Sequence, residues 1–226
     1  MRRSDVNRAI RSAAAAFSET CIHLPPFASW KPSDWVERRT SALELMRAGL
    51  GWDVVEWRPG EFAEHGLVLF TLRNVLRAGE SAAGDGYAEK VMLVKSNQRT
   101  PLHAHRRKME DIINRGGGTL VIEVRAEREE QVGRPVLVNG VAKVIAGERE
   151  TVILTPGESI TFPPDTFHAF YASGDDVIVG EVSTYNDDAS DNDFLEPLER
   201  FPSFEEDAPA ERLVVGDYPR LMSAWA

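Results

Sequence analysis

The chain has little of what marks several classes of protein. Cys21 is its only cysteine, so no intrachain disulfide can form, which fits a reducing compartment and predicts a cytoplasmic protein. Every apolar run is far shorter than the roughly 20 residues that a membrane-spanning helix needs. Positive charge is also scarce: 26 lysines and arginines face 36 aspartates and glutamates, for a formal net charge of −10 at pH 7. Nucleic acids and anionic membranes attract basic proteins, so we expect neither as a partner, and a neutral or weakly charged ligand instead.

The first 50 residues predict helices. Between residues 5 and 19, apolar side chains share one face at helical spacing, and two prolines follow. The residues on that face are Val6, Ile10, Ala13, Ala14 and Phe17. A second helix is predicted near residues 33–46, with Gly49 and Gly51 at its exit. We therefore expect residues 1–50 to form a helical segment that packs on the remainder of the chain.

From Trp52 onward the pattern changes to many short apolar runs separated by turn residues, such as GLVLFTLRN, TLVIEVRA and ETVILTPG. Closely spaced strands without helical patterns between them predict a mainly β fold, an antiparallel sandwich or barrel, over residues 51–186. Asn139 and Gly140, flanked by LV and VAKV, predict a hairpin with a type I′ turn, which needs positive φ at both positions.

Residues 187–226 are acidic and contain prolines. We expect them to form an ordered C-terminal extension that wraps the β region, because apolar side chains recur along them. These anchors are Phe194, Leu195, Leu198, Phe201 and Phe204. In this prediction the segments 1–50, 51–186 and 187–226 together make one structural domain.

Three of the five histidines stand where they could bind one metal ion. In the stretch TPLHAHRRKME, His103 and His105 point to the same side, because residues i and i+2 share a face of a strand. Glu110 follows after RRKM, a gap that lets the chain turn and bring the carboxylate back to that side. His168 begins another predicted strand in PPDTFHAF. Three imidazoles and one carboxylate suit Mn, Fe, Co, Ni or Zn and leave positions open for substrate or water.

Other features have more ordinary explanations. The other two histidines are interpreted as hydrogen-bonded surface or core residues. The three glycines at 116–118 lead into the strand TLVIEV and not into a helix, so they predict a turn with close backbone approach and no phosphate-binding loop. Trp30, Trp35 and Trp57 could stack on a sugar, but packing in a core or interface is the more frequent role of tryptophan.

Two stretches resemble the motifs of the cupin superfamily: HAHRRKMEDIINRGG is similar to the first and GESITFPPDTFH to the second. Three positions depart from the pattern. Asn97 and Asp165 stand where glycine is usual, and both residue types tolerate left-handed turns, whereas Ala172 replaces an asparagine. The resemblance implies a cupin-type antiparallel β-barrel, a jelly roll, whose mouth holds the metal ion.

A closer resemblance covers most of the chain. The segments LPPFASW, GLVLFTLRN, GEVSTYNDDASDNDFLEP and, above all, KMEDIINRGGG joined to the upstream HxH are similar to the D-lyxose isomerase family of cupins. That resemblance implies an isomerase that interconverts D-lyxose and D-xylulose, and often D-mannose and D-fructose, at a divalent metal that is typically manganese. It also implies a homodimer, an assembly that would cover open sheet edges.

The implied reaction requires a base. A proton moves between C2 and C1 through a cis-enediol(ate), whose charge a divalent ion can stabilise as a Lewis acid. Glu181 is the first candidate, because an acid amid the apolar strand DVIVGEV needs a partner or a function; the alternative is a structural pair with a buried lysine or arginine. Asp191 is the second candidate, in an acidic loop where a solvated turn is the usual explanation.

Two lysines are candidates for holding sugar hydroxyls or an oxyanion. In YAEKVMLVKS, strand alternation sets Lys90, Met92 and Val94 on one face, so Lys90 could point into the barrel; the alternative is a surface lysine. Lys108 lies two residues before Glu110 and is placed to reach the open side of the metal.

Two other functions stay open at this point. Three histidines and one glutamate also suit an Fe(II) cupin dioxygenase. A non-catalytic sugar-binding cupin would bind its ligand without converting it. The sequence contains no helix-turn-helix or other nucleic-acid module, which disfavours a sugar-responsive regulator.

Overall fold

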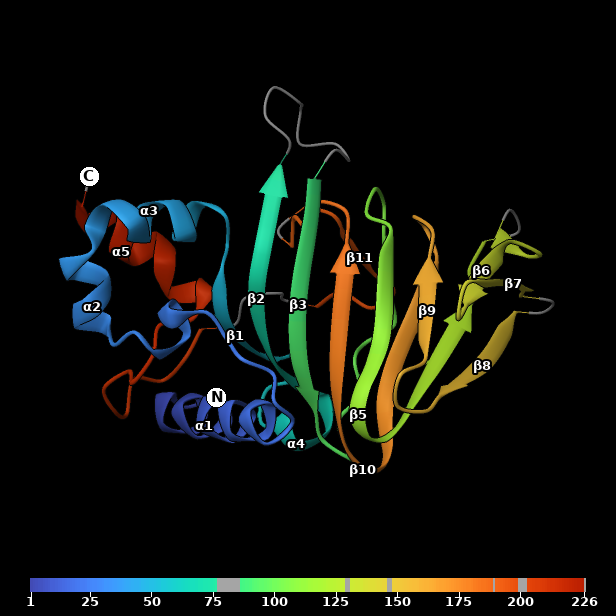
Figure 1. The fold of residues 1–226 in the computed structure, drawn as a ribbon, viewed down its shortest axis with the longest axis horizontal. Helices are drawn as coiled ribbons and strands as arrows, with labels where there is room; N and C mark the ends of the chain where they lie inside the picture. Colours follow the sequence, from blue (N-terminus) through green and yellow to red (C-terminus); the bar gives the residue numbers. More distant parts are fainter. Residues whose placement is uncertain (77–85, 129–130, 146–147, 189, 199–202, 226) are drawn as a thin grey trace.

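The computed structural model describes residues 1–76, 86–128, 131–145, 148–188, 190–198 and 203–225 (Figure 1). Its helices are α1 (Arg3–Glu19), α2 (Pro32–Glu37), α3 (Arg39–Arg47), α4 (Phe62–His65) and α5 (Tyr218–Trp225), with the 3-10 helices η1 (Pro26–Ser29) and η3 (Val215–Asp217). Its strands are β1 (Gly51–Glu56), β2 (Gly66–Leu76), β3 (Gly86–Val94), β4 (His103–His105), β5 (Glu110–Arg125), β6 (Pro135–Val138), β7 (Val141–Val144), β8 (Arg149–Leu154), β9 (Ser159–Phe162), β10 (Phe167–Ser183) and β11 (Asn192–Phe194).

The two longest strands, β5 and β10, pair antiparallel along almost their whole length. One half of this pair is extended by β3, β2 and β1 on one side and by β9, β6 and β7 on the other. The other half is extended by β4 and β11 on one side and by β8 on the other. The predicted mainly β, antiparallel fold is confirmed.

The sheet does not close into the barrel that the cupin resemblance implied. Its strand order runs from β1 to β7, and among the described residues these two end strands do not pair with each other. Figure 1 shows why β1 needs no such partner: the helices α2, α3 and α5 lie beyond it, at the end of the sheet opposite β6 and β7. Val214, just before η3, also bridges to Trp52 of β1. The fold is therefore an open jelly-roll sandwich.

Strand β3 separates two cores, because its side chains alternate between them. Met92 and Val94 belong to the core between the β layers. Val91 and Leu93 belong to a second core that α1 covers with its apolar face. The predicted alternation of β3 is confirmed, and it places Lys90 on the side of the inner core.

The helical predictions were partly right. The first helix is confirmed as α1, and all five predicted face residues pack in the second core. The second predicted helix is two helices, because at Arg38 the backbone leaves the helical region with φ −101° and ψ 32°. The predicted hairpin is confirmed: β6 and β7 are joined through Asn139 and Gly140, with φ of 50° and 78°. None of the helices in the described ranges has the length and hydropathy that crossing a bilayer requires.

The C-terminal residues return to the N-terminal helix after β11. The buried guanidinium of Arg3 donates to Glu206 at 2.6 Å and to Asp217 at 2.7 Å. Phe204 packs on the core under α1, as expected of an anchor. Phe194 instead lines the cavity described below, Leu195 is 46% exposed, and Phe201 lies outside the described residues. The division of the chain into three segments stays a prediction.

The glycines at 116–118 do not form the turn that the sequence predicted. They lie inside β5, opposite a break in the register of β10 between Ser173 and Val177. Gly117 has φ of 96°, and a Cβ built there would lie 2.0 Å from the carbonyl oxygen of Asp176. The prediction of a close backbone approach at these glycines is confirmed. The backbone that approaches them is the bulge in β10, and at this bulge both strands bend together.

This bend predicts a large cost for a side chain at Gly117. Gly117→Ala adds a backbone clash to the strain of positive φ and is expected to lower the free energy of unfolding by about 3–5 kcal/mol. Gly157 is the matched control, because its φ is 94° and nothing lies within 4 Å of its missing Cβ. Gly157→Ala is expected to cost about 1–2 kcal/mol. Urea denaturation measures both, and equal costs would refute the contact with Asp176.

Candidate metal centre and active site

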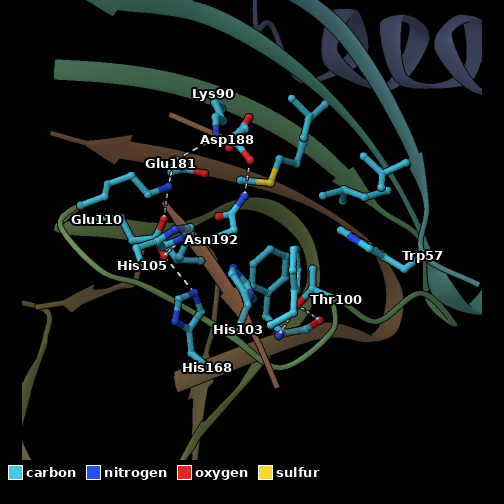
Figure 2. Close-up of a pocket in the computed structure, with 18 residues that line it drawn as sticks. Trp57, Lys90, Thr100, His103, His105, Glu110, His168, Glu181, Asp188 and Asn192 are labelled. Carbon is cyan, nitrogen blue, oxygen red and sulfur yellow. Dashed lines mark hydrogen bonds and ion pairs between the residues drawn. The ribbon is translucent and has the colours of Figure 1, made fainter. Parts of the chain in front are cut away.

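Strands β4, β5 and β10 bring four ligand-type side chains to one point (Figure 2). His103 and His105 project from one side of β4, while Ala104 between them points away and is buried. His168 of β10 is the ladder partner of His103, and Glu110 is the first residue of β5. One ligand atom from each of the four residues lies within 4.8 Å of all the others. The set expected from sequence is therefore assembled in space.

Backbone carbonyls fix the orientation of two imidazoles. The Nδ1 atoms of His103 and His168 each lie 2.9 Å from a carbonyl oxygen, of Pro101 and Thr166 respectively. A carbonyl oxygen only accepts, so both Nδ1 atoms carry the proton, and in the neutral ring Nε2 presents a lone pair. Holding one ring nitrogen in this way is the usual arrangement for a histidine that binds a metal through the other.

The atoms at the centre fit a cation. His168 Nε2 lies 2.8 Å from Glu110 Oε1, and His105 Nε2 lies 3.2 Å from the same oxygen. Both His168 Nε2 and Glu110 Oε1 are buried without a hydrogen-bond partner among the described residues. A lone pair facing a carboxylate oxygen is repulsive unless a positive charge stands with them, and buried orphan groups of this kind are rare. These four residues can hold a metal ion.

Protonation states at the centre also suit metal binding. Burial lowers the pKa of His103 well below its ordinary value, and burial likewise lowers the pKa of His105. Burial alone would raise the pKa of Glu110, but His105 and Lys108 outweigh it and hold the pKa well below the usual range. These shifts favour neutral imidazoles on His103 and His105 and an ionised carboxylate on Glu110, the forms that ligate metals.

A buried chain of opposite charges leads away from the centre. The Lys108 ammonium lies 2.7 Å from Glu110 Oε2 and 2.8 Å from Glu181 Oε1. Lys90 lies 3.4 Å from the same Glu181 oxygen, and Ser183 Oγ donates to it at 3.3 Å. Burial opposes charge on Glu181, but Lys108 and Lys90 prevail and lower its pKa. Lys90 points inward as the alternation predicted, and both lysines and Glu181 line the cavity.

Asp191 is placed differently from Glu181. Its carboxylate is buried but does not line the cavity. Oδ1 accepts from the backbone N–H of Arg107 at 3.0 Å, and Oδ2 accepts from the backbone N–H of Lys108 at 3.0 Å. The Asp191 carbonyl accepts from the N–H of Arg106 at 3.2 Å. Asp191 therefore holds the loop that joins His105 to Glu110.

Sequence reasoning missed three polar residues of the site. Asn186 Oδ1 accepts from Lys90 at 2.7 Å and from Lys108 at 3.4 Å, and Asp188 Oδ1 lies 3.2 Å from Lys90. Asn192 and Asp188 line the cavity. All three belong to the acidic stretch YNDDASDND, whose composition suggests solvent exposure. Its attachment to the end of the buried strand β10 was the one available signal.

A family model described as D-lyxose isomerase matches residues 1–218 of the chain. The chain belongs to the D-lyxose isomerase family. Two relatives are similar over nearly their full lengths. A D-lyxose/D-mannose isomerase from Escherichia coli O157:H7 is 44% identical over 96% of this chain and 98% of its own. A D-lyxose/D-mannose isomerase from Serratia proteamaculans is 42% identical over 99% of this chain and 100% of its own.

Solved structures of similar shape include two L-ribose isomerases. The enzyme of Acinetobacter sp. DL28 in complex with L-ribose aligns with a TM-score of 0.55 and 19% identity, over 87% of this chain and 93% of that one. The enzyme of Cellulomonas parahominis with L-psicose aligns with a TM-score of 0.54 and 20% identity, over 86% and 92% of the two chains. At such identity the likeness shows the fold alone.

Membership of the D-lyxose isomerase family decides between the functions that the sequence left open. The protein is an enzyme, an aldose–ketose isomerase that acts on a small sugar. The dioxygenase and the non-catalytic binding protein are set aside.

The geometry of this D-lyxose isomerase family member predicts one metal ion per chain. After chelation, titration with Mn²⁺ in a calorimeter is expected to show about one site, and free ion at 100 times Kd should raise the free energy of unfolding by about 2.7 kcal/mol. His168→Ala is expected to weaken binding at least about 100-fold, since a lost ligand costs more than a lost outer partner. His65→Ala is the control, because His65 lies outside the cluster and should leave the stoichiometry unchanged. Equal binding by both variants would contradict the site.

Proposed function

We propose that the protein interconverts D-lyxose and D-xylulose, and D-mannose and D-fructose, by metal-dependent proton transfer between C2 and C1. The observation that carries the proposal is the buried path from Glu110 Oε2 through the Lys108 ammonium to Glu181 Oε1, with steps of 2.7 and 2.8 Å. It supports an isomerase because a base must lie within reach of the carbons whose oxygens are held at the centre. The two aldoses are those named for the relatives, and the two ketoses are the products of moving the proton from C2 to C1.

The four-ligand cluster is the site proposed for a divalent ion. Held by His103, His105, Glu110 and His168, the ion would supply Lewis-acid stabilisation of the negative charge that develops on the two substrate oxygens. Manganese is the first candidate, with Co²⁺, Fe²⁺, Ni²⁺ and Zn²⁺ as alternatives that the same ligands accept.

Glu181 is the proposed base and then acid. Its lowered pKa keeps the carboxylate ionised and able to take a proton from C2, which it then returns to C1. Lys108, whose pKa is raised because Glu110 and Glu181 outweigh the effect of its burial, stays an ammonium and can donate to a substrate oxygen. Lys90, held between Asn186 and Asp188, is proposed to bind a sugar hydroxyl.

Asp191 is proposed to position the loop rather than to transfer a proton. Its two carboxylate oxygens are engaged by the backbone N–H groups of Arg107 and Lys108, and it is absent from the cavity lining. It therefore acts on the site through the loop between two metal ligands. A cytoplasmic location and a homodimeric assembly stay predictions.

Conversion of sugars by the Mn²⁺-loaded enzyme tests the proposal. D-xylulose is expected from D-lyxose and D-fructose from D-mannose, measured by chromatography. Activity should disappear after chelation and return with Mn²⁺. If the protein binds Mn²⁺ but forms no ketose from either aldose, the proposed substrates are wrong.

Glu181 and Asp191 are separated by a paired substitution. Glu181→Gln removes the base and is expected to lower kcat by about 10²–10⁴-fold while Mn²⁺ affinity stays unchanged. Asp191→Asn leaves one acceptor oxygen for the two backbone N–H groups that hold the loop between the metal ligands. It should therefore weaken Mn²⁺ binding about 10-fold or more, and lower kcat at saturating metal far less than Glu181→Gln does. Calorimetry and initial rates give both quantities. The opposite result, with kcat lost in Asp191→Asn and kept in Glu181→Gln, would exchange the two roles.

A further inference from the structure

One wall of the catalytic cavity is apolar and carries a single indole. Val55 on β1 and Trp57 just beyond it face the cavity, because they alternate with Val54 and Trp52, which belong to the core under α1. Leu67 and Leu69 of β2 continue this wall. Figure 2 shows Trp57 on the side of the cavity away from Lys90, Asp188 and Glu181.

The indole nitrogen of Trp57 is a donor without an acceptor. Nε1 is buried and has no hydrogen-bond partner among the described residues. Thr100, whose side chain is the one hydroxyl in the cavity lining, does not accept from it: its Oγ1 instead accepts from the N–H of Phe170 at 2.9 Å. An indole N–H usually finds a partner when it is buried, as Trp52 Nε1 does by donating to the carbonyl of Ala28 at 2.9 Å. An orphan donor at the edge of a ligand cavity indicates a ligand acceptor.

A sugar bound here has to satisfy its hydroxyls inside the protein. Its reacting carbons lie by the metal ligands and Glu181, where charged groups are abundant. The remainder of the carbon chain extends away from them, and a hydroxyl pressed against apolar side chains alone would lose its water without compensation. The other members of the wall, Val55, Leu67 and Leu69, offer no polar side-chain atom. Among the residues of this wall, Trp57 alone carries a side-chain donor, and its Nε1 has no hydrogen-bond partner among the described residues.

We infer that Trp57 determines specificity by donating its indole N–H to the terminal hydroxyl of the sugar, the C5 hydroxyl of D-lyxose. The ring meanwhile packs on the apolar face of the chain end. This assignment rests on the proposed function, and it adds the residue that recognises the end of the substrate opposite the reacting carbons.

A cycle of enzyme and substrate changes tests this contact. Trp57→Phe keeps an aromatic ring and removes the donor, and 5-deoxy-D-lyxose lacks only the acceptor. Each single change is expected to lower kcat/KM about 5- to 10-fold, mainly through KM, as for one hydrogen bond. Both changes together should lose no more than about twofold beyond either alone, because the same bond is removed twice. Mn²⁺ stoichiometry should stay at the wild-type value.

Trp52→Phe is the matched control, since its indole is bonded within the core and lies outside the cavity. It is expected to lower the urea midpoint and to leave kcat/KM unchanged, whereas Trp57→Phe should leave the midpoint unchanged or raise it. Full additivity in the cycle, or an unchanged kcat/KM for Trp57→Phe, overturns the assignment. If Trp57→Phe does not fold, equal kcat/KM of the wild type for D-lyxose and its 5-deoxy analogue overturns it. No conversion of D-lyxose by the Mn²⁺-loaded wild type overturns the proposed function and this contact with it.

Discussion

The pairing of β5 with β10 is the constraint on which the molecule depends. The ladder runs from Glu110 and Ser183 at one end to Arg125 and Phe167 at the other, and its halves belong to different parts of the sandwich. Because both strands bend at the glycines of β5, the same pair of strands carries His168 in one half and Glu110 and Glu181 in the other. The distance between the metal cluster and the proposed base is thus set by backbone pairing, which is stiffer than a loop.

Burial makes the charges of the site depend on one another. Lys108 and Lys90 face three carboxylates, those of Glu110, Glu181 and Asp188, so these five side chains hold an excess of one negative charge. Burial lowers the pKa of His103 and His105, which favours their neutral forms. A cation at the cluster would restore the balance, and removing any one ion from such a group leaves its partner buried and uncompensated, which is costly.

Sequence predicted the parts of the site that follow from local periodicity. The HxH spacing puts two imidazoles on one face of β4, and alternation along β3 turns Lys90 inward, because each needs only the period of a strand. The turn expected at residues 116–118 was wrong because the bulge that accommodates those glycines lies on another strand. The role of Asp191 depends on N–H groups about 84 residues earlier in the chain, and the division of the second helix at Arg38 has no local signal. Asn186 and Asp188 were missed because an acidic, polar stretch looks the same whether water or a lysine satisfies it.

The position of Lys108 explains how two carboxylates so close together can have different tasks. Two unscreened carboxylates in a buried site would share a proton, since like charges raise one pKa. The ammonium between Glu110 Oε2 and Glu181 Oε1 neutralises that repulsion and keeps both groups ionised. Glu110 turns its other oxygen to the histidines, where a proton would compete with a metal ion. Glu181, which lies outside that cluster, is the group proposed to accept a proton from carbon. In the proposed reaction Lys108 thus allows Glu110 to act as a metal ligand and Glu181 to act as the base.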